Sequence, residues 1–194
     1  LFNQHTRLTL GLRAENYNLD TVVDYEDPSF LLSDNNPSFD DWLFGGKITI
    51  EHDLNNSYST FTSITKGYKA GGANIFPGLE GNFTTSYNTE ELWNYEIGLR
   101  SNLFESALIS QITVFYLDRE NAQLRSSAGV GVDFTYGTTN AGDARHYGAE
   151  LESTWFINKN WSISAGLGLL DTELASSGVE LSSAPNYTYN TRID

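Results

Sequence analysis

The sequence predicts an all-β chain of about eight antiparallel, up-and-down strands that form part of the wall of a transmembrane β-barrel. Three observations predict this fold class. Apolar and polar residues alternate with a period of two over much of the chain. The connections between the expected strands are short and long in turn, and tryptophans stand close to strand ends. We therefore expect one partial barrel domain, residues 1–194, with no separate second domain.

Period-two alternation identifies the individual strands, because successive side chains of a strand point to opposite faces. The pattern is clear in five segments: 7–17, 42–53, 91–102, 146–156 and 161–170. Weaker alternation predicts three more: 57–65, 108–124 and 187–194. In 108–124 the apolar residues Phe115, Tyr116 and Leu117 are adjacent, so the pattern does not assign the faces of that strand.

The connections favour a membrane barrel over a soluble sandwich. Short turns are expected at 53–57, 102–106 and 158–160, and long polar segments at 18–41, 71–90, 125–143 and 171–185. Outer-membrane barrels combine tight periplasmic turns with long extracellular loops, whereas a sandwich has no reason for this order. Indole rings near strand ends suit the membrane–water interface. They belong to Trp42, Trp93, Trp155 and Trp161.

Composition excludes several classes of protein. The formal net charge of −14, from 25 acidic and 11 basic residues, argues against binding nucleic acid. The absence of cysteine removes thiolate metal sites and cysteine nucleophiles. No apolar run approaches the roughly 18–20 residues of a transmembrane helix. The chain opens at Leu1 with neither an initiator Met nor a signal peptide, so we expect a trimmed segment of a longer protein.

Four ordered motifs resemble barrel strands of the TonB-dependent receptor family. Segment 65–74, TKGYKAGGAN, is similar to a family stretch in which a strand leaves the membrane as GYKAGG-N. Segment 87–100 resembles Y-x-x-E-x-x-x-x-Y-E-x-G-x-K/R, and 114–123 resembles FY-x-D-x-x-x-x-Q. Segment 140–152 resembles N-A-G-x-A-x-x-x-G-x-E-x-E. The motifs follow the family's order and spacing and cover about half of the chain, from 57 to 155.

The resemblance implies a fragment of a receptor for active transport across the bacterial outer membrane, and not an enzyme. The implied nutrient is a ferric siderophore or a similarly scarce compound. Family members have a plug domain inside a barrel of about 22 strands, and we expect the plug and the TonB-contacting segment in the missing part of the parent chain. Outer-membrane lipid, the plug, TonB and a metal chelate or other nutrient are the implied partners. No cofactor is implied.

Ligand contact is expected from the long segments, which carry aromatic side chains for stacking and cations for an anionic chelate. The candidates are Phe76, Phe83, Tyr87, Arg119, Arg125, Phe134 and Tyr136. Packing of one loop against the next is the competing, and favoured, interpretation of each. The polar face of the strands is expected to line the lumen with Glu96, Arg100, Glu150 and Glu152.

The residues indicate neither a catalytic nor a metal site. Glu150 and Glu152 face one side of a strand and would suit acid/base work, but a hydrated lumen face with Arg100 and Arg145 as partners fits better. The histidines stand in different strands without metal-ligand spacing. They are His5, His52 and His146.

Two other functions remain open at this point. One is a small closed outer-membrane barrel of eight strands, acting as a porin or adhesin, which requires 7–17 to pair with 187–194. The other is a soluble all-β module that binds sugars or protein. Such a module would expose its polar face to water and bury its apolar face in a core.

Overall fold

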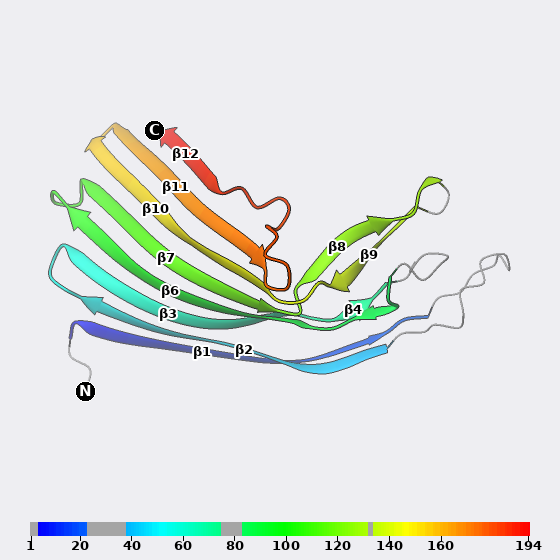
Figure 1. Ribbon diagram of the computed structural model, residues 1–194. Helices are drawn as coiled ribbons and strands as arrows, with labels where there is room; N and C mark the ends of the chain where they lie inside the picture. Colours follow the sequence, from blue (N-terminus) through cyan, green and yellow to red (C-terminus); the bar gives the residue numbers. More distant parts are fainter. Residues whose placement is uncertain (1–3, 23–37, 75–82, 132–133) are drawn as a thin grey trace.

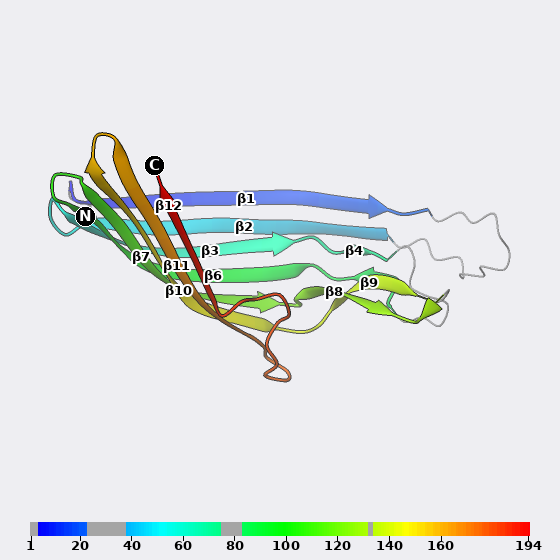
Figure 2. The same ribbon diagram turned by 90° about the horizontal axis from the view of Figure 1, so that it is seen from above.

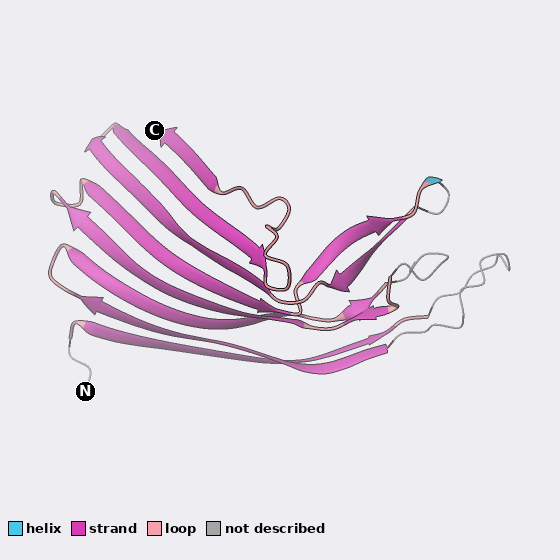
Figure 3. Ribbon diagram, in the orientation of Figure 1, coloured by secondary structure: helices cyan, strands magenta, loops and turns pink. Residues whose placement is uncertain are grey.

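The computed structural model describes residues 4–22, 38–74, 83–131 and 134–194, and strands dominate these ranges (Figure 3). Eight long strands form one sheet: β1 (Thr6–Asp20), β2 (Ser38–Asp53), β3 (Tyr58–Lys69), β6 (Glu90–Leu103), β7 (Leu108–Glu120), β10 (Ala144–Asn158), β11 (Trp161–Leu174) and β12 (Tyr187–Ile193). Two hairpins form separate sheets: β4 (Gly72–Ala73) with β5 (Ser86–Tyr87), and β8 (Gln123–Ala128) with β9 (Thr135–Asn140). Within the described ranges, no helix is long and apolar enough to cross a membrane.

The eight long strands follow one another in chain order, and every neighbouring pair is antiparallel. The sheet curves into a trough, and β12 turns back toward the side on which β1 lies (Figures 1 and 2). β1 and β12 are the two edges of the described sheet and do not pair with each other. The chain is therefore an open wall, and the small closed barrel that requires this pairing is not formed.

All eight predicted strands are confirmed, and most of their boundaries differ from the prediction by up to four residues. β1 and β2 continue to Asp20 and Ser38, which shortens the first long connection. The expected strand 108–124 was wrong at its end, because β7 stops at Glu120. Asn121 has a φ of 55°, a left-handed conformation that Asn tolerates better than most residues. The chain turns there and begins β8 instead of continuing β7.

The short and long connections lie at opposite ends of the sheet, as predicted. The turns between β2 and β3, β6 and β7, and β10 and β11 gather at one end, where β1 begins and β12 ends (Figure 1). The hairpins β4–β5 and β8–β9 extend from the other end. We call that end the long-loop end, and in an outer-membrane barrel it faces outward from the cell.

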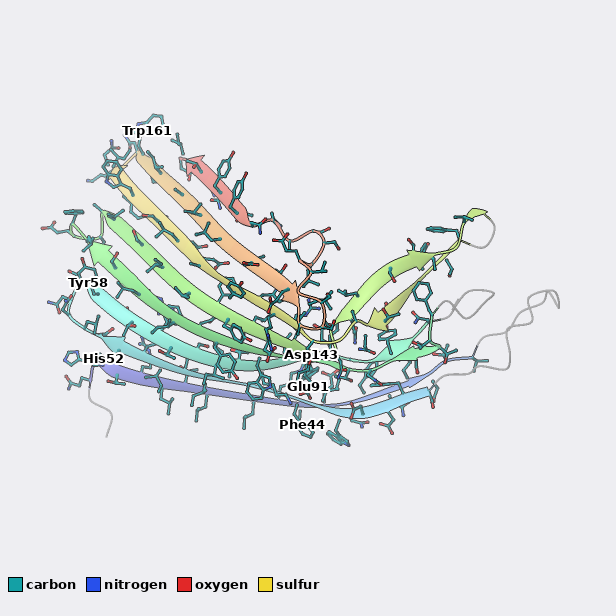
Figure 4. All side chains as sticks on the ribbon, in the orientation of Figure 1. Phe44, His52, Tyr58, Glu91, Asp143 and Trp161 are labelled. Atoms are coloured by element: carbon teal, nitrogen blue, oxygen red, sulfur yellow. The ribbon has the colours of Figure 1, made fainter. Side chains whose placement is uncertain are left out.

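The convex face of the sheet is apolar. Phe44 projects from this face (Figure 4), and the strand alternation places the predicted apolar residues beside it. One row of paired residues crosses all eight strands: Leu8, Ile50, Thr62, Ile97, Val114, Ala149, Leu169 and Tyr187. Most large apolar side chains of this face are solvent-exposed in the isolated wall. A soluble module would bury them in a core, whereas a barrel covers them with lipid.

The concave face is polar. The corresponding row contains Arg7, Glu51, Phe61, Gly98, Thr113, Glu150, Gly168 and Thr188. The structure also assigns the faces that the sequence left open. Phe115 lies on the concave face, where its ring covers Gly148, and Tyr116 lies on the convex face beside Tyr95, with ring centroids 6.3 Å apart.

Candidate functional site

A buried polar cluster joins the strands at the long-loop end. Glu90, the first residue of β6, accepts two hydrogen bonds from the guanidinium of Arg119 near the end of β7, at 2.7 and 2.9 Å. The side chains of Glu90 and Arg119 are only 4% and 19% exposed. Glu90 also accepts the backbone N–H of Gln123 at 2.7 Å. The carboxylate therefore ties the start of one strand to the end of the next and to the β8–β9 hairpin.

The environment of Glu90 favours its charged form. Burial by itself raises the pKa of this carboxyl, but the hydrogen bonds from Arg119 and from the Gln123 backbone outweigh it and hold the pKa below its usual value. Glu90 lies beyond Trp93, the residue that ends the apolar series of β6, and so stands at the rim of the wall. The ion pair therefore stabilises the rim by joining β6 to β7 and to the β8–β9 hairpin.

The side chain of Gln123 extends this cluster to two further segments. Its amide nitrogen lies 3.2 Å from the carbonyl of Lys69, 2.9 Å from that of Ala70 and 3.0 Å from that of Asn88. Gln123 itself is buried, and its amide nitrogen shares its two N–H donors among these three carbonyls. One side chain thus connects the end of β3, the segment after β5 and the start of β8.

Two asparagines connect the hairpins to each other. The carboxamide of Asn74, just after β4, both donates to and accepts from the backbone of Thr138 in β9, at 2.8 Å in each case. The carboxamide of Asn140, at the end of β9, does the same with the backbone of Asn88, at 3.0 and 2.7 Å. Each carboxamide takes the place that a backbone peptide group has in a sheet.

These contacts bring together one polar residue from each of the four motifs that resemble the receptor family. Glu90, Gln123 and Asn140 are separated in the chain but are linked in turn through hydrogen bonds that include the Asn88 backbone, and Asn74 joins them through Thr138 of the same strand as Asn140. None of these four residues was among the site residues predicted from the sequence. Each of them lies in one of the ordered motifs and near the end of a predicted strand, and this position could have identified them. The spacing of the motifs in the chain does not show, however, that the four segments meet in space.

The predicted ligand-contact residues fall into two groups, apart from Phe76, which lies outside the described residues. Phe83, Tyr87 and Arg119 are built into the rim. The Phe83 ring is 7% exposed and lies against Gly137, the Tyr87 hydroxyl lies against Gly72, and Arg119 is paired with Glu90. These placements agree with loop packing, and ligand contact by these residues stays a prediction.

The second group forms an exposed surface on the β8–β9 hairpin. The guanidinium carbon of Arg125 lies 4.7 Å from the ring centroid of Tyr136, and Phe134 meets the same tyrosine edge-on at 5.9 Å. Phe134 and Tyr136 are 55% and 56% exposed. We call Arg125, Phe134 and Tyr136 the hairpin surface. It combines an exposed cation with aromatic faces, which suits an anionic ligand with flat groups.

The strand alternation places the predicted lumen residues Glu96, Arg100, Glu150 and Glu152 on the polar, concave face. Arg100 and Arg145 were expected to pair with Glu150 and Glu152, and the structure corrects this expectation. Arg100 donates to Glu51 and to Gln111, at 2.9 Å to the latter, so its partner is not a β10 glutamate. Arg145 pairs with Glu173 at 3.4 Å. Since Arg145 is an odd number of residues from both glutamates, its side chain lies on the other face of β10.

The described residues hold no group of three or more His, Asp or Glu side chains that would bind a metal ion. His52 instead shares a hydrogen bond with Thr6 at 2.9 Å, and His146 lies 3.4 Å from a guanidinium nitrogen of Arg119.

An open antiparallel wall with an apolar convex face, a polar concave face and long loops at one end defines a section of a β-barrel of the outer-membrane type. Residues 2–194 match the family described as "TonB dependent receptor-like, beta-barrel". The chain belongs to this family. Its members are outer-membrane proteins of Gram-negative bacteria, and this segment is part of the barrel wall.

Relatives in sequence include the pesticin receptors of Yersinia enterocolitica and Yersinia pestis. The chain is 33% identical to the former and 32% identical to the latter over 132 residues. The matches cover 66% of this chain and 18% of each relative, so the matched segment spans less than a fifth of the length of these relatives.

Solved structures of low sequence identity share the fold. The ferric yersiniabactin uptake receptor FyuA from Yersinia pestis superposes with a TM-score of 0.75 at 20% identity, over 98% of this chain and 29% of that one. The copper transporter OprC gives 0.74 at 19% identity, over 98% and 31%. These named relatives are receptors and a transporter.

Proposed function

We propose that the parent protein is an outer-membrane receptor for active uptake of a metal chelate of the ferric-siderophore class. Residues 1–194 are one partial barrel domain of it, without a catalytic role. The names of the relatives support this cargo, since they include receptors for ferric yersiniabactin and ferripyoverdine. The observation that carries the proposal within this chain is the hairpin surface: a guanidinium 4.7 Å from a tyrosine ring, exposed at the long-loop end.

The hairpin surface suits such a cargo chemically. Metal chelates with catecholate or phenolate groups have flat aromatic parts and a net negative charge. Arg125 would attract the charge, while Phe134 and Tyr136 offer ring faces for stacking. The net charge of −14 would repel an anion over most of the surface, so the exposed Arg125 and its neighbouring rings would serve as an entry point.

The two faces of the wall fit the remaining partners. Outer-membrane lipid would cover the apolar convex face, and a plug domain would fill the polar concave face. TonB would act on that plug. The plug and the segment that contacts TonB would belong to parts of the parent protein beyond the barrel wall described here. The lumen residues Glu96, Arg100, Glu150 and Glu152 would then face the plug and the transport path.

Uptake by the full-length parent protein tests the proposal. The gene is expressed in a Gram-negative host that lacks its own siderophore receptors, and accumulation of radioactive iron is measured from catecholate, phenolate and hydroxamate chelates. We expect TonB-dependent accumulation from at least one of them. Uptake of cobalamin or maltodextrin without iron would overturn the ligand class, and accumulation that is unchanged in a TonB-deficient host would overturn active transport.

Substitutions in the same host test the hairpin surface. Arg125→Ala and Tyr136→Ala should each raise the chelate concentration for half-maximal uptake about tenfold, the effect of losing about 1.4 kcal/mol of binding. Arg145→Ala is the matched control, because Arg145 is an exposed, ion-paired arginine on the convex side of β10. Equal effects of Arg125→Ala and Arg145→Ala would remove the hairpin surface from the ligand path.

A further inference from the structure

We propose that the β4–β5 and β8–β9 hairpins move as one body, joined by the carboxamides of Asn74 and Asn140, and that these two asparagines are positioning residues for the hairpin surface. The positioning role rests on the proposed function. The joining of the hairpins rests on contacts alone and is tested without a ligand.

Asn74 forms the first connection, and it uses its whole carboxamide. Nδ2 donates to the carbonyls of Thr138 and Thr84, both at 2.8 Å, and Oδ1 accepts the backbone N–H of Thr138 at 2.8 Å. The Asn74 backbone N–H adds a bond to the carbonyl of Thr85 at 2.9 Å. Asn74 therefore holds both strands of its own hairpin and the middle of β9, which is 64 residues away in the chain.

Asn140 forms the second connection in the reverse direction. Its Oδ1 accepts the backbone N–H of Asn88 at 2.7 Å, and its Nδ2 donates to the carbonyls of Asn88 at 3.0 Å and Asn121 at 2.8 Å. The first connection runs from the β4–β5 hairpin to the backbone of β9. The second runs from the end of β9 to the backbone that follows β5.

An apolar contact accompanies the two connections. The buried ring of Phe83 lies so close to Gly137 that a Cβ there would stand 2.6 Å from Cγ of the ring. Gly137 precedes Thr138, the partner of Asn74. Three separate contacts fix one rigid body on another, whereas a single contact would leave a hinge.

The position of the hairpin surface follows from these contacts. Tyr136 directly precedes Gly137, and Arg125 pairs with Thr138 across the β8–β9 ladder. Fixing β9 at Gly137 and Thr138 therefore fixes the Tyr136 ring and the Arg125 guanidinium that lies over it. A surface that is already ordered loses less entropy when a ligand binds.

The hydrogen bonds of the first connection require both the donor and the acceptor of the Asn74 carboxamide, which makes Asn74 difficult to replace. Alanine removes all three side-chain bonds. Aspartate keeps the acceptor for the Thr138 N–H but places a carboxylate against the carbonyls of Thr84 and Thr138, where a donor is required. Asn74→Asp should therefore uncouple the hairpins as strongly as Asn74→Ala, although it has nearly the same shape.

Hydrogen–deuterium exchange of the full-length receptor in detergent, without ligand, tests the joining. Asn74→Ala should speed exchange of the Thr138 amide about tenfold, and Asn140→Ala should do so for Asn88, as expected for losing roughly 1.4 kcal/mol of local stability. In one body, each substitution should also speed exchange at the other's partner amide. Acceleration confined to the direct partner would overturn the joint body.

Two further variants make the outcome specific. Asn186→Ala is the matched control, since Asn186 donates to Glu180 within its own connection and should leave both amides unchanged. Gly137→Val displaces Phe83 without touching either carboxamide and should speed exchange at Thr138 and Asn88 together. If Gly137→Val leaves both amides protected, the Phe83 contact does not belong to the joint.

Uptake of the ferric chelate found for the wild-type receptor separates this inference from the proposed function. Asn74→Ala and Asn74→Asp should each raise the concentration for half-maximal uptake several-fold and leave the maximal rate unchanged, since only ligand capture is affected. Faster exchange with unchanged uptake would overturn the positioning role and keep the joint body. A wild-type receptor that accumulates no ferric chelate would overturn the proposed function and with it the positioning role. Whether the two hairpins move as one body would then be decided by hydrogen–deuterium exchange alone.

Discussion

Arg119 and Glu90 stand 29 residues apart in the chain, and their side chains meet in two parallel hydrogen bonds of 2.7 and 2.9 Å. This fork geometry is the strongest arrangement available to an arginine and a carboxylate. The backbone N–H of Gln123 supplies a third bond to the same carboxylate. The pair therefore stabilises the junction of β6, β7 and the β8–β9 hairpin, and its loss should be felt by the whole rim.

Glu90→Gln tests the contribution of this pair. The amide keeps the shape of Glu90 but leaves the guanidinium of Arg119, 19% exposed, without its counter-charge. Breaking a buried pair in this way costs about 3–5 kcal/mol, and the partial exposure of Arg119 places our expectation near the lower end. The measurement is urea unfolding of the full-length receptor, followed by its heat-modifiable gel migration.

Glu173→Gln is the control for Glu90→Gln. Its partner Arg145 is 3.4 Å away, and both side chains are well exposed. Exposed pairs contribute about 0–1 kcal/mol, so this substitution should be close to neutral. If the two variants lost similar free energies of unfolding, the Glu90–Arg119 pair would contribute no more than a surface ion pair.

The same pair should make the rim sensitive to acid. Hydrogen bonds from Arg119 and Gln123 hold the folded pKa of Glu90 below its usual value despite burial, while the unfolded value is about 4.3. The stabilisation is therefore fully present above about pH 4.3 and is lost as the pH falls through the folded pKa. Urea midpoints of wild type and Glu90→Gln should differ by a constant amount at neutral pH and converge in acid. A difference that grows in acid would contradict this sign.

The strands and their faces could be predicted because period two is a local property. Ile97 and Glu96 take opposite faces of β6 whatever the rest of the chain does, and the structure places them so. The pattern fails where apolar residues adjoin. Phe115 and Tyr116 divide between the faces because Phe115 finds space over Gly148, a glycine on the next strand, and this requires the register of β7 with β10.

The rim could not be predicted from the sequence for a different reason. Glu90 is hidden among 25 acidic residues, and only the sheet order brings it to Arg119. The partner predicted for Arg100 was wrong for the same reason. Arg100 was expected to reach the glutamates of β10, but Glu51, two strands away on the other side, already accepts its guanidinium. Alternation predicts which face a charge occupies but not which neighbour it meets.

Arginine substitutions should distinguish the two faces of the wall. Leu99→Arg and Leu167→Arg place a charge on the apolar convex face, where lipid would surround it, at a cost of about 2–4 kcal/mol at mid-membrane depth. Glu96→Arg and Ser164→Arg place the same side chain on the polar concave face of the same strands and should cost several times less. Folding of the full-length receptor into lipid vesicles, followed by urea titration, measures both. Equal costs on the two faces would overturn the sidedness of the wall.

Gly98 should be a site where even one methyl group is not tolerated. A Cβ there would overlap the ring of Phe61 and stand 3.0 Å from the carbonyl of Ile112. The ring is buried and has little freedom to move, because the guanidinium of Arg100 covers it at 4.5 Å from the centroid and is itself bonded to Glu51. Gly98→Ala should therefore lower the free energy of unfolding by about 1–3 kcal/mol.

Gly11 provides the matched control for Gly98, since both glycines lie on the concave face. A Cβ at Gly11 meets no atom within 4 Å, so Gly11→Ala should be neutral or should stabilise by about 0.4–1 kcal/mol through the unfolded chain. A double-mutant cycle then identifies the cause of the Gly98 effect. If the Phe61 ring causes the clash, Phe61→Leu should recover part of the loss in Gly98→Ala. Purely additive losses would assign the intolerance to the backbone of Ile112 instead.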